Sequence, residues 1–216
     1  MNNSLSSRPD YADNSRPPLL ALVPKNVQVV LDIGCNEGGF GAALKKSHAM
    51  EVWGVEPDFK SAAQAKIKLD HVVVDFFQEN NPIPDNYFDL VTFNDSLEHM
   101  PDPTVALNLA RKKLKPSGII MCCVPNMRHV ECMEHLLFDK DWRYEELGIR
   151  DRTHLRFFTR KSIERLFVEM NFSIVDVHFI NDDWWDSKRI FRRIIFRLFK
   201  RHTWDMRFKQ IVVLAK

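Results

Sequence analysis

Four of the seven glycines of this 216-residue chain fall within eight residues, at positions 34, 38, 39 and 41. They follow a valine-rich apolar run and precede a helical pattern. A glycine-rich loop in that position lets the backbone approach a ligand closely, and it points the N–H groups of a helix N-terminus at the ligand. Many kinds of nucleotide-binding loop share these properties, so the loop from Asp32 to Gly39 predicts a nucleotide-like ligand without identifying it.

Two acidic residues at the ends of the next two expected strands narrow the type of ligand. Glu56 lies 22 residues after Gly34, where a carboxylate can accept hydrogen bonds from both hydroxyls of a ribose. Asp75 follows the next apolar run, where it can accept a hydrogen bond from the amino group of an adenine. Phe76 or Phe77 beside it can pack on the ring. The loop and the two acids together predict an adenosine-binding site.

Alternating strands and helices are needed to bring these residues to one edge of a sheet. Apolar runs predict seven strands, over residues 27–33, 52–56, 71–75, 88–93, 119–124, 172–179 and 210–214. Helices are predicted over residues 40–48, 61–68, 103–114 and 161–170, with a turn at Lys115–Gly118. This order is typical of a doubly wound, Rossmann-like α/β fold. We expect a seven-stranded, mainly parallel sheet with an antiparallel last strand and helices on both faces.

The chain length fits one domain, because 216 residues suffice for a single core and no linker interrupts the pattern. We expect a flexible N-terminal arm over residues 1–18 and a single domain over residues 19–216. Within this domain, residues 126–159 interrupt the strand–helix rhythm and are expected to form a lid or substrate-binding segment. Residues 181–209 are expected to form a basic amphipathic insertion.

Composition and segment patterns exclude several classes of protein. No apolar run approaches the roughly 20 residues that span a bilayer, and the polar N-terminus lacks the layout of a signal peptide. These features predict a cytoplasmic protein. The four cysteines (Cys35, Cys122, Cys123 and Cys132) form no C-x-x-C pair, so we expect reduced core cysteines instead of disulfides or a zinc site.

Several motifs between about residues 27 and 125 make the chain resemble the class I methyltransferases. The motifs are Val30-Leu31-Asp32-Ile33-Gly34-Cys35, Gly54-Val55-Glu56-Pro57-Asp58, Val74-Asp75-Phe76, Phe88-Asp89-Leu90-Val91 with Leu97-Glu98-His99, and Leu114-Lys115-Pro116-Ser117-Gly118. The resemblance implies S-adenosyl-L-methionine as the cofactor and S-adenosyl-L-homocysteine as its product. A dehydrogenase-type dinucleotide fold is disfavoured, because the glycines do not have the usual G-x-G-x-x-G spacing.

The resemblance also implies which residues bind the cofactor. Asp32 and Gly34 are expected near its methionine end, Glu56 at the ribose, Asp75 at the adenine and Asn94 beside the cofactor at the end of the fourth strand. The same motifs add Cys35, Asn36, Gly38, Pro57 and Phe76 to the expected site. The family usually has glycine where this chain has Asn36. Asparagine tolerates left-handed backbone better than most residues, so we expect the loop to be kept.

Methyl transfer to a hydroxyl needs an acceptor held in line and a group that removes one proton, and histidine suits that removal near neutral pH. His99 follows the fourth strand, and His154 lies within residues 151–159. That stretch, with Tyr11 and residues 16–24, resembles a bacterial methyltransferase subgroup associated with polysaccharide and glycosylated natural product biosynthesis. The resemblance implies O-methylation of a sugar, a glycan or a glycosylated or lipid-linked small molecule, with His154 or His99 as general base. Both histidines also have a structural alternative: loop bracing for His99 and a buried backbone contact for His154.

The same region supports two rival hypotheses. Asp95, Glu98 and His99 have the i, i+3, i+4 spacing of one helical face, and with His154 they offer ligands for a metal ion. Small-RNA 3′-terminal 2′-O-methyltransferases have a similar arrangement, with glutamate in place of Asp95, so Mg²⁺-dependent RNA methylation is one alternative. A non-catalytic cofactor-binding partner subunit is the other. The favoured interpretation needs no metal and no nucleic acid, and it has a small-molecule or glycan acceptor as the only ligand besides the cofactor.

Charge is distributed unevenly along the chain. Residues 188–209 carry a formal charge of +8, and the remainder carries −6. A helical pattern over residues 188–201 separates apolar positions from basic ones. The apolar residues are Ile190, Phe191, Ile194, Ile195, Leu198 and Phe199, and the basic residues are Arg189, Arg192, Arg193, Arg197, Lys200 and Arg201. Such a helix fits peripheral contact with an anionic membrane, a phosphate-bearing acceptor or RNA, while a core helix with a solvated basic face is the simpler alternative.

Overall fold

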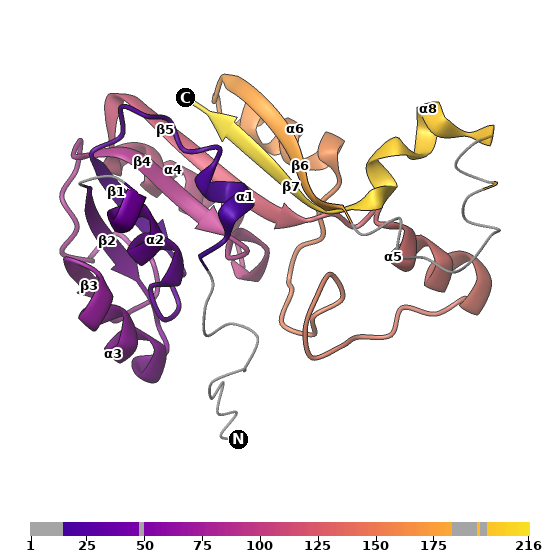
Figure 1. The fold of residues 1–216 in the computed structure, drawn as a ribbon, viewed down its shortest axis with the longest axis horizontal. Helices are drawn as coiled ribbons and strands as arrows, with labels where there is room; N and C mark the ends of the chain where they lie inside the picture. Colours follow the sequence, from indigo (N-terminus) through magenta and orange to yellow (C-terminus); the bar gives the residue numbers. More distant parts are fainter. Residues whose placement is uncertain (1–14, 48–49, 183–193, 195–197) are drawn as a thin grey trace.

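The computed structural model describes residues 15–47, 50–182, 194 and 198–216, and it contains one seven-stranded sheet (Figure 1). The strands are β1 (Val29–Ile33), β2 (Glu51–Val55), β3 (His71–Val73), β4 (Phe88–Asn94), β5 (Leu114–Pro125), β6 (Ile174–Asp182) and β7 (Phe208–Ala215). Their order across the sheet is β3-β2-β1-β4-β5-β7-β6. The pairs from β3 to β5 are parallel, and β7 is antiparallel to both β5 and β6. The predicted fold class, including the antiparallel last strand, is confirmed.

Helices cover both faces of this sheet (Figure 1). They are α1 (Pro17–Leu20), α2 (Gly39–Ser47), α3 (Phe59–Lys68), α4 (Pro103–Lys113) and α6 (Arg160–Glu169). Local sequence explains where three of them begin. Asp58 and Asp102 accept hydrogen bonds from backbone N–H groups in the first turns of α3 and α4, and Thr159 forms a capping box with Ser162 at the start of α6.

Successive strand residues point to opposite faces of the sheet and so enter two different apolar cores. Val30 of β1 packs with Leu19 of α1 and Leu44 of α2 in one core. The next residue, Leu31, packs in the other core with Leu107 of α4 and Phe167 of α6. Burial on both faces explains why the central strands are continuous apolar runs in the sequence.

Several predicted boundaries differ from the structure. The turn predicted at Lys115–Gly118 lies within β5, because Leu114 pairs with Phe88 before a register shift and regular pairing resumes at Ile119. β3 ends at Val73, so Asp75 lies two residues beyond the strand. At the N-terminus, residues 17 and 18 begin α1 instead of belonging to the predicted flexible arm, which otherwise falls largely on residues outside the described part.

The segment over residues 126–159 continues from the carboxyl end of β5. It contains α5 (Val130–Glu134) and a π-helix, η3 (His135–Asp139), followed by irregular chain. Figure 1 shows α5 projecting away from the sheet, on the same side as α8 (Lys200–Thr203). The segment returns to the sheet where Phe158 bridges Asn126. It therefore forms a long excursion from the edge at which the parallel strands end.

The predicted basic helix over residues 188–201 falls mostly outside the described residues. Within the part that is described, Ile194, Leu198 and Phe199 are exposed, with Leu198 at 72%. The other residues on which the core-helix alternative depends lie outside the described part. No helix among the described residues is long and apolar enough to cross a membrane. The four cysteines are buried and free, as predicted.

Candidate active site

The glycine loop leaves β1 with three residues in left-handed conformation. These are Gly34 (φ 76°), Asn36 (φ 50°) and Gly38 (φ 75°). A Cβ at Gly34 would lie 2.7 Å from the Cβ of Ser96, so this position requires glycine for its space as well as its backbone. Asn36 adopts the left-handed conformation that its glycine-like position demands. The loop therefore turns directly into α2 at Gly39, with backbone N–H groups near the end of the strand.

Glu56, directly after β2, is held against this loop. Its Oε2 accepts a hydrogen bond from the backbone N–H of Asn36 at 2.9 Å, and its Oε1 accepts one from the N–H of Asp58, also at 2.9 Å. Burial raises the pKa of Glu56, and the two backbone donors oppose that rise. Each carboxylate oxygen keeps a second lone pair, so a fixed pair of acceptors lies beside the loop, as a ribose diol requires.

Asp32 and Asn94 meet where β1 and β4 end side by side. Asp32 is 2% exposed, and its Oδ1 accepts hydrogen bonds from Thr92 Oγ1 at 2.6 Å and from Asn94 Nδ2 at 3.1 Å. Burial raises the pKa of Asp32 to about 6 against the opposing effects of Thr92 and the charge of Arg16. The Oδ1 atom of Asn94 is buried and has no hydrogen-bond partner among the described residues. The side chains of Asp32 and Asn94 thus form a buried polar pair where β1 leads into the glycine loop.

Other predicted cofactor residues occupy different environments. Asp75 accepts hydrogen bonds from the N–H of Phe76 and from the side chains of Gln78 and Asn81, which fix its carboxylate in the loop after β3. Phe76 is 71% exposed, whereas Phe77 packs edge-on against Phe93 in the core. Of the two phenylalanines, Phe76 is therefore the one with a ring free to stack on an adenine.

Cys35 and Pro57 flank the same loop without offering a polar side chain to it. Cys35 is buried under the loop, and a Cβ at Gly54 would lie 2.5 Å from its Sγ. Its contribution to a ligand is therefore limited to its backbone. Pro57 is exposed between Glu56 and Asp58, where it continues the turn that follows β2.

Arg16 is a residue of this region that sequence reasoning did not single out. Its guanidinium is largely buried and forms an ion pair with Asp95 at 2.7 Å, and Gln210 of β7 donates to the same carboxylate. Asp95 has a left-handed φ of 53° at the end of β4. No spacing rule points to Arg16, because it reaches the strand ends only through the packing of α1 on the sheet.

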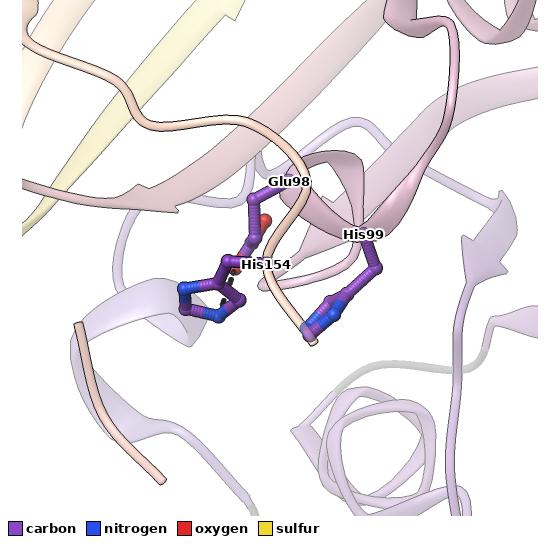
Figure 2. A group of neighbouring side chains, drawn as sticks. All are labelled: Glu98, His99 and His154. Atoms are coloured by element: carbon purple, nitrogen blue, oxygen red, sulfur yellow. Dashed lines mark ion pairs between the residues drawn. The ribbon is translucent and has the colours of Figure 1, made fainter. Parts of the chain in front are cut away.

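Three side chains from two distant segments gather beyond the end of β4 (Figure 2). Glu98 and His99 belong to the 3₁₀ helix η2 (Leu97–His99), and His154 comes from the end of the 126–159 segment. Their potential ligand atoms lie within 4.8 Å of one another, and the His154 Nε2 to Glu98 Oε1 distance is 3.9 Å. The backbone carbonyl of Glu98 accepts hydrogen bonds from the N–H groups of Leu155 and Arg156, which hold the two segments together.

Backbone carbonyls orient both histidines. The Nδ1 of His154 lies 3.1 Å from the carbonyl oxygen of Ile149, and the Nδ1 of His99 lies 3.2 Å from that of Thr153. A carbonyl oxygen only accepts, so Nδ1 carries the hydrogen in each ring and a neutral ring has its lone pair on Nε2. Burial, followed by the proximity of His99, lowers the pKa of His154 and favours this neutral form.

Asp95 does not belong to the cluster of Glu98, His99 and His154. The inclusion of Asp95 in the four-residue metal site considered from sequence is therefore wrong. Its carboxylate is engaged by Arg16 and Gln210 instead. The left-handed backbone at Asp95 interrupts the regular helix that i, i+3, i+4 spacing assumes. The structure does bring Glu98, His99 and His154 together, although 55 residues separate the two histidines in sequence.

Comparison with known proteins identifies relatives of this chain. A family model described as a methyltransferase domain matches residues 8–177. A ubiquinone biosynthesis O-methyltransferase from Histophilus somni is 31% identical over an alignment of 100 residues, covering 42% of this chain and 42% of that protein. A protein of the same name from Psychrobacter arcticus is 23% identical over 177 residues, covering 77% of this chain and 66% of its own length. The matched region thus spans about two fifths of the first of these relatives.

Solved structures with low sequence identity share the fold. A SAM-dependent methyltransferase from Archaeoglobus fulgidus superimposes with a TM-score of 0.63 at 22% identity, covering 89% of this chain and 87% of that one. The 1,6-didemethyltoxoflavin-N1-methyltransferase of Burkholderia thailandensis, solved with bound 1,6-didemethyltoxoflavin and S-adenosylhomocysteine, gives a TM-score of 0.61 at 17% identity. It covers 94% of this chain and 78% of its own. The likeness in fold thus covers about nine tenths of this chain in both comparisons.

Proposed function

The chain belongs to the methyltransferase domain family, and from that premise we propose that it transfers the methyl group of S-adenosyl-L-methionine to a hydroxyl oxygen of a small acceptor. The observation that carries the proposal is the pairing of the left-handed glycine loop with Glu56, whose two carboxylate oxygens are fixed by backbone N–H groups. This arrangement suits the adenosine part of the cofactor. The name of the Histophilus somni relative supports oxygen as the acceptor atom.

The cofactor would lie along the carboxyl ends of β1, β2 and β4. We assign the ribose hydroxyls to Glu56 and the adenine amino group to Asp75, with the exposed ring of Phe76 against the base. Asp32, Gly34, Gly38 and Asn94 are assigned to the methionine end and the loop around it. Arg16 provides a buried positive charge near the same strand ends, which would attract the carboxylate of the methionine group.

Chemistry takes place at the sulfonium methyl carbon. The acceptor oxygen attacks that carbon in line as the bond to sulfur breaks, which leaves S-adenosyl-L-homocysteine as a neutral thioether. The hydroxyl proton must pass to another group, and the cluster of Glu98, His99 and His154 lies beyond the same edge of the sheet. The predicted general bases, His154 and His99, both belong to this cluster, so it is our candidate for the proton-accepting part of the site.

Two acceptor classes follow from different observations. The resemblance of residues 151–159 to a polysaccharide-associated subgroup implies a sugar or glycan hydroxyl, while the two relatives described above are named ubiquinone biosynthesis O-methyltransferases. Both are hydroxyl acceptors, and neither requires a nucleic acid. We propose a glycan or other small-molecule hydroxyl as the acceptor, since the stretch that carries the resemblance to the polysaccharide-associated subgroup also supplies His154 to the candidate site.

The experiment measures transfer of a radiolabelled methyl group from S-adenosyl-L-methionine to a panel of acceptors. The panel contains sugars and lipid-linked sugars, dihydroxylated aromatic rings and an RNA 3′ end. Transfer to a sugar supports the full proposal. Transfer to a ring hydroxyl keeps the O-methyltransferase assignment and overturns the acceptor class, and transfer to RNA overturns the acceptor class in favour of the RNA alternative.

Cofactor binding with no transfer to any acceptor on the panel would contradict the proposal and favour a non-catalytic partner subunit. The binding control is Glu56→Gln, in which an amide NH₂ replaces one of the two acceptor oxygens. Its matched control is Glu79→Gln, at an exposed carboxylate paired with Lys112 of α4. We expect Glu56→Gln to lose transfer and Glu79→Gln to keep it.

A further inference from the structure

Glu98 is buried without hydrogen-bond donors to its carboxylate among the described residues. The residue is 0% exposed, and neither Oε1 nor Oε2 has a hydrogen-bond partner among the described residues. Burial, together with the nearby carboxylate of Asp95, raises the pKa of Glu98 well above its usual value. A buried carboxyl group without donors is costly, so its side chain needs a specific reason to stay there. A cation that binds between Glu98 and its neighbours would supply the missing partner.

The two neighbouring histidines are oriented as metal ligands are. Metal-bound histidines commonly donate the other ring N–H to a backbone carbonyl, which fixes both the tautomer and the ring direction. His154 does so to Ile149 and His99 does so to Thr153. The Nε2 atom of each neutral ring then carries the lone pair, and the Nε2 of His154 lies 3.9 Å from Oε1 of Glu98. Figure 2 shows the two rings beside the carboxylate, with one from each segment.

The loop that carries His154 is itself fixed by hydrogen bonds. Asp151 accepts bonds from the N–H and hydroxyl of Thr153, and the backbone N–H groups of Leu155 and Arg156 donate to the carbonyl of Glu98. These contacts position His154 over η2 before any ion binds. Such pre-positioning lowers the ordering cost of bringing three ligands to one ion.

We propose that Glu98, His99 and His154 bind one divalent transition-metal ion through one carboxylate oxygen and two imidazole nitrogens. Ligand bonds of about 2.0–2.2 Å would draw the three atoms closer than their present 4.8 Å limit. Glu98 can move without breaking a hydrogen bond. The donor set favours ions such as Mn²⁺, Fe²⁺, Co²⁺ or Zn²⁺ over Mg²⁺ and Ca²⁺, because imidazole suits the former and oxygen-only sets suit the latter.

Three protein ligands leave positions on the ion for other oxygens. An acceptor hydroxyl bound there would lose its proton more readily, because a divalent ion lowers the pKa of a coordinated O–H group. In that case His99 and His154 serve as ligands and not as bases. This catalytic role rests on the proposed methyl transfer, whereas the metal site rests on the geometry of the three side chains alone.

The first test measures binding and needs no substrate. The full chain is stripped with chelator, and calorimetric titrations are performed with Mn²⁺, Co²⁺, Zn²⁺ and Mg²⁺. We expect one ion per chain, weaker binding of Mg²⁺ and, with Co²⁺, visible absorption bands from nitrogen and oxygen ligation. Glu98→Gln and His154→Gln should each weaken binding at least tenfold. His178→Gln, at a histidine of β6 paired with Asp176, should leave it unchanged.

Several results would overturn the metal site. The first is that wild type binds no metal ion at concentrations of about 100 μM. The second is that Glu98→Gln and His154→Gln both bind the ion as tightly as wild type does. The third is that the His178→Gln control loses as much metal affinity as these two variants. Circular dichroism and thermal unfolding of each variant exclude simple failure to fold. A rise in the melting temperature of wild type with Co²⁺, absent in Glu98→Gln, provides a second readout that supports the site.

The second test separates the site from its catalytic role. Chelator should abolish methyl transfer by wild type, and added Mn²⁺ or Co²⁺ should restore it. Full activity of a chelated enzyme that binds the ion in the first test would refute the catalytic role and leave the site standing. If no acceptor is methylated at all, the proposed function fails, while calorimetry still decides whether the metal site exists.

Discussion

Three carboxylates at the carboxyl-end edge of the sheet show how differently the protein treats the same functional group. Glu56 is satisfied by two backbone N–H groups, and Asp32 by the side chains of Thr92 and Asn94. Glu98 has no hydrogen-bond donor among the described residues. The first environment suits a fixed acceptor for ribose hydroxyls and the third suits a cation. This difference between Glu56 and Glu98 is why we assign the first to the cofactor site and the second to the metal site.

Gly34 provides a sharp test of the cofactor loop. Gly34→Ala should abolish detectable binding of S-adenosyl-L-homocysteine in calorimetry, because its new Cβ would be 2.7 Å from the Cβ of Ser96, whose hydroxyl donates to Ile33. Gly148→Ala is the matched control. Gly148 also has a positive φ, but a Cβ added there would have no atom within 4 Å. Both variants should lose about 1–2 kcal/mol of stability from the left-handed backbone, and Gly34→Ala should lose more because of the added contact with Ser96. Equal cofactor affinity in the two variants would contradict the close approach at Ser96.

Asp32 should impose a pH dependence on stability in the absence of cofactor. Its pKa is about 6 in the folded protein, against an ordinary value of 3.8, so the folded chain holds a proton that the unfolded chain releases. The stability it contributes is complete below about pH 4 and is lost as the pH rises through about 6. The loss is on the order of 3 kcal/mol for a shift of about two units.

Urea unfolding of wild type and Asp32→Asn between pH 4 and pH 7 measures this effect. The stability of wild type relative to the variant should fall by about 2–3 kcal/mol over that range. The comparison with Asp32→Asn is needed because Asp32 interacts electrostatically with other titratable groups, namely Arg16, Glu56 and Cys35. Parallel stability curves for the two proteins would show that Asp32 ionises normally in the fold.

At the scale of elements, the end of β5 is tied to the start of β7 by Asn126. This residue is 0% exposed, and its Nδ2 donates to the carbonyls of Asp205 and Phe208 while its Oδ1 accepts from the N–H of Arg128. Arg128 adds an ion pair to Asp205 at 2.8 Å. The buried amide of Asn126 and the Arg128–Asp205 ion pair therefore link the segment after β5 to the chain just before β7.

Asn126→Ala should destabilise the protein by about 2–4 kcal/mol, because it leaves two buried carbonyls and one N–H without their partner. Chemical unfolding measures the loss, and hydrogen exchange should show it concentrated around residues 126–128 and 205–208. Asn108→Ala is the control, since Asn108 is an exposed residue of α4 and alanine is the better helix former. A loss below about 0.5 kcal/mol in Asn126→Ala would mean that the tether contributes little.

At the scale of the whole molecule, the sheet edge with the candidate site lies on the side from which α5 projects (Figure 1). Four exposed apolar residues flank α8 in the sequence: Ile194, Leu198, Phe199 and Trp204. The basic residues predicted to accompany them lie within residues 188–201, mostly outside the described part. We propose that this region contacts an anionic membrane, because exposed apolar side chains and basic residues in one segment are the usual features of interfacial helices.

Co-sedimentation with lipid vesicles tests this proposal. The chain should bind vesicles rich in anionic lipid, bind neutral vesicles weakly, and dissociate as the salt concentration rises. Reversing Arg192, Arg193 and Arg197 to glutamate should lower the partition coefficient roughly hundredfold or more, at about 1 kcal/mol for each basic residue. The same reversal at Lys60, Lys66 and Lys68 of α3 is the charge-matched control. An equal effect of the two triple variants would show that net charge alone drives binding.

The sequence by itself determined the fold class and the order of the main strands, and it predicted which residues would gather at the edge where the parallel strands end. Strand periodicity, the glycines around Gly34 and the acids Glu56 and Asp75 are local signals, and parallel strands bring their carboxyl ends to one edge by topology alone. The turn predicted at Lys115–Gly118 shows the limit of such local signals. Leu114 pairs with Phe88 of β4, and this long-range interaction places residues 115–118 within β5.

Only the tertiary structure decided which side chains meet beyond the strand ends. Arg16 reaches Asp95 through the packing of α1, and His154 reaches Glu98 because the 126–159 segment returns to η2. The left-handed backbone of Asp95 separates it from the helical face that sequence spacing assigned to it. These contacts depend on the path of the chain between residues far apart in sequence, and no periodicity or spacing within one segment encodes that path.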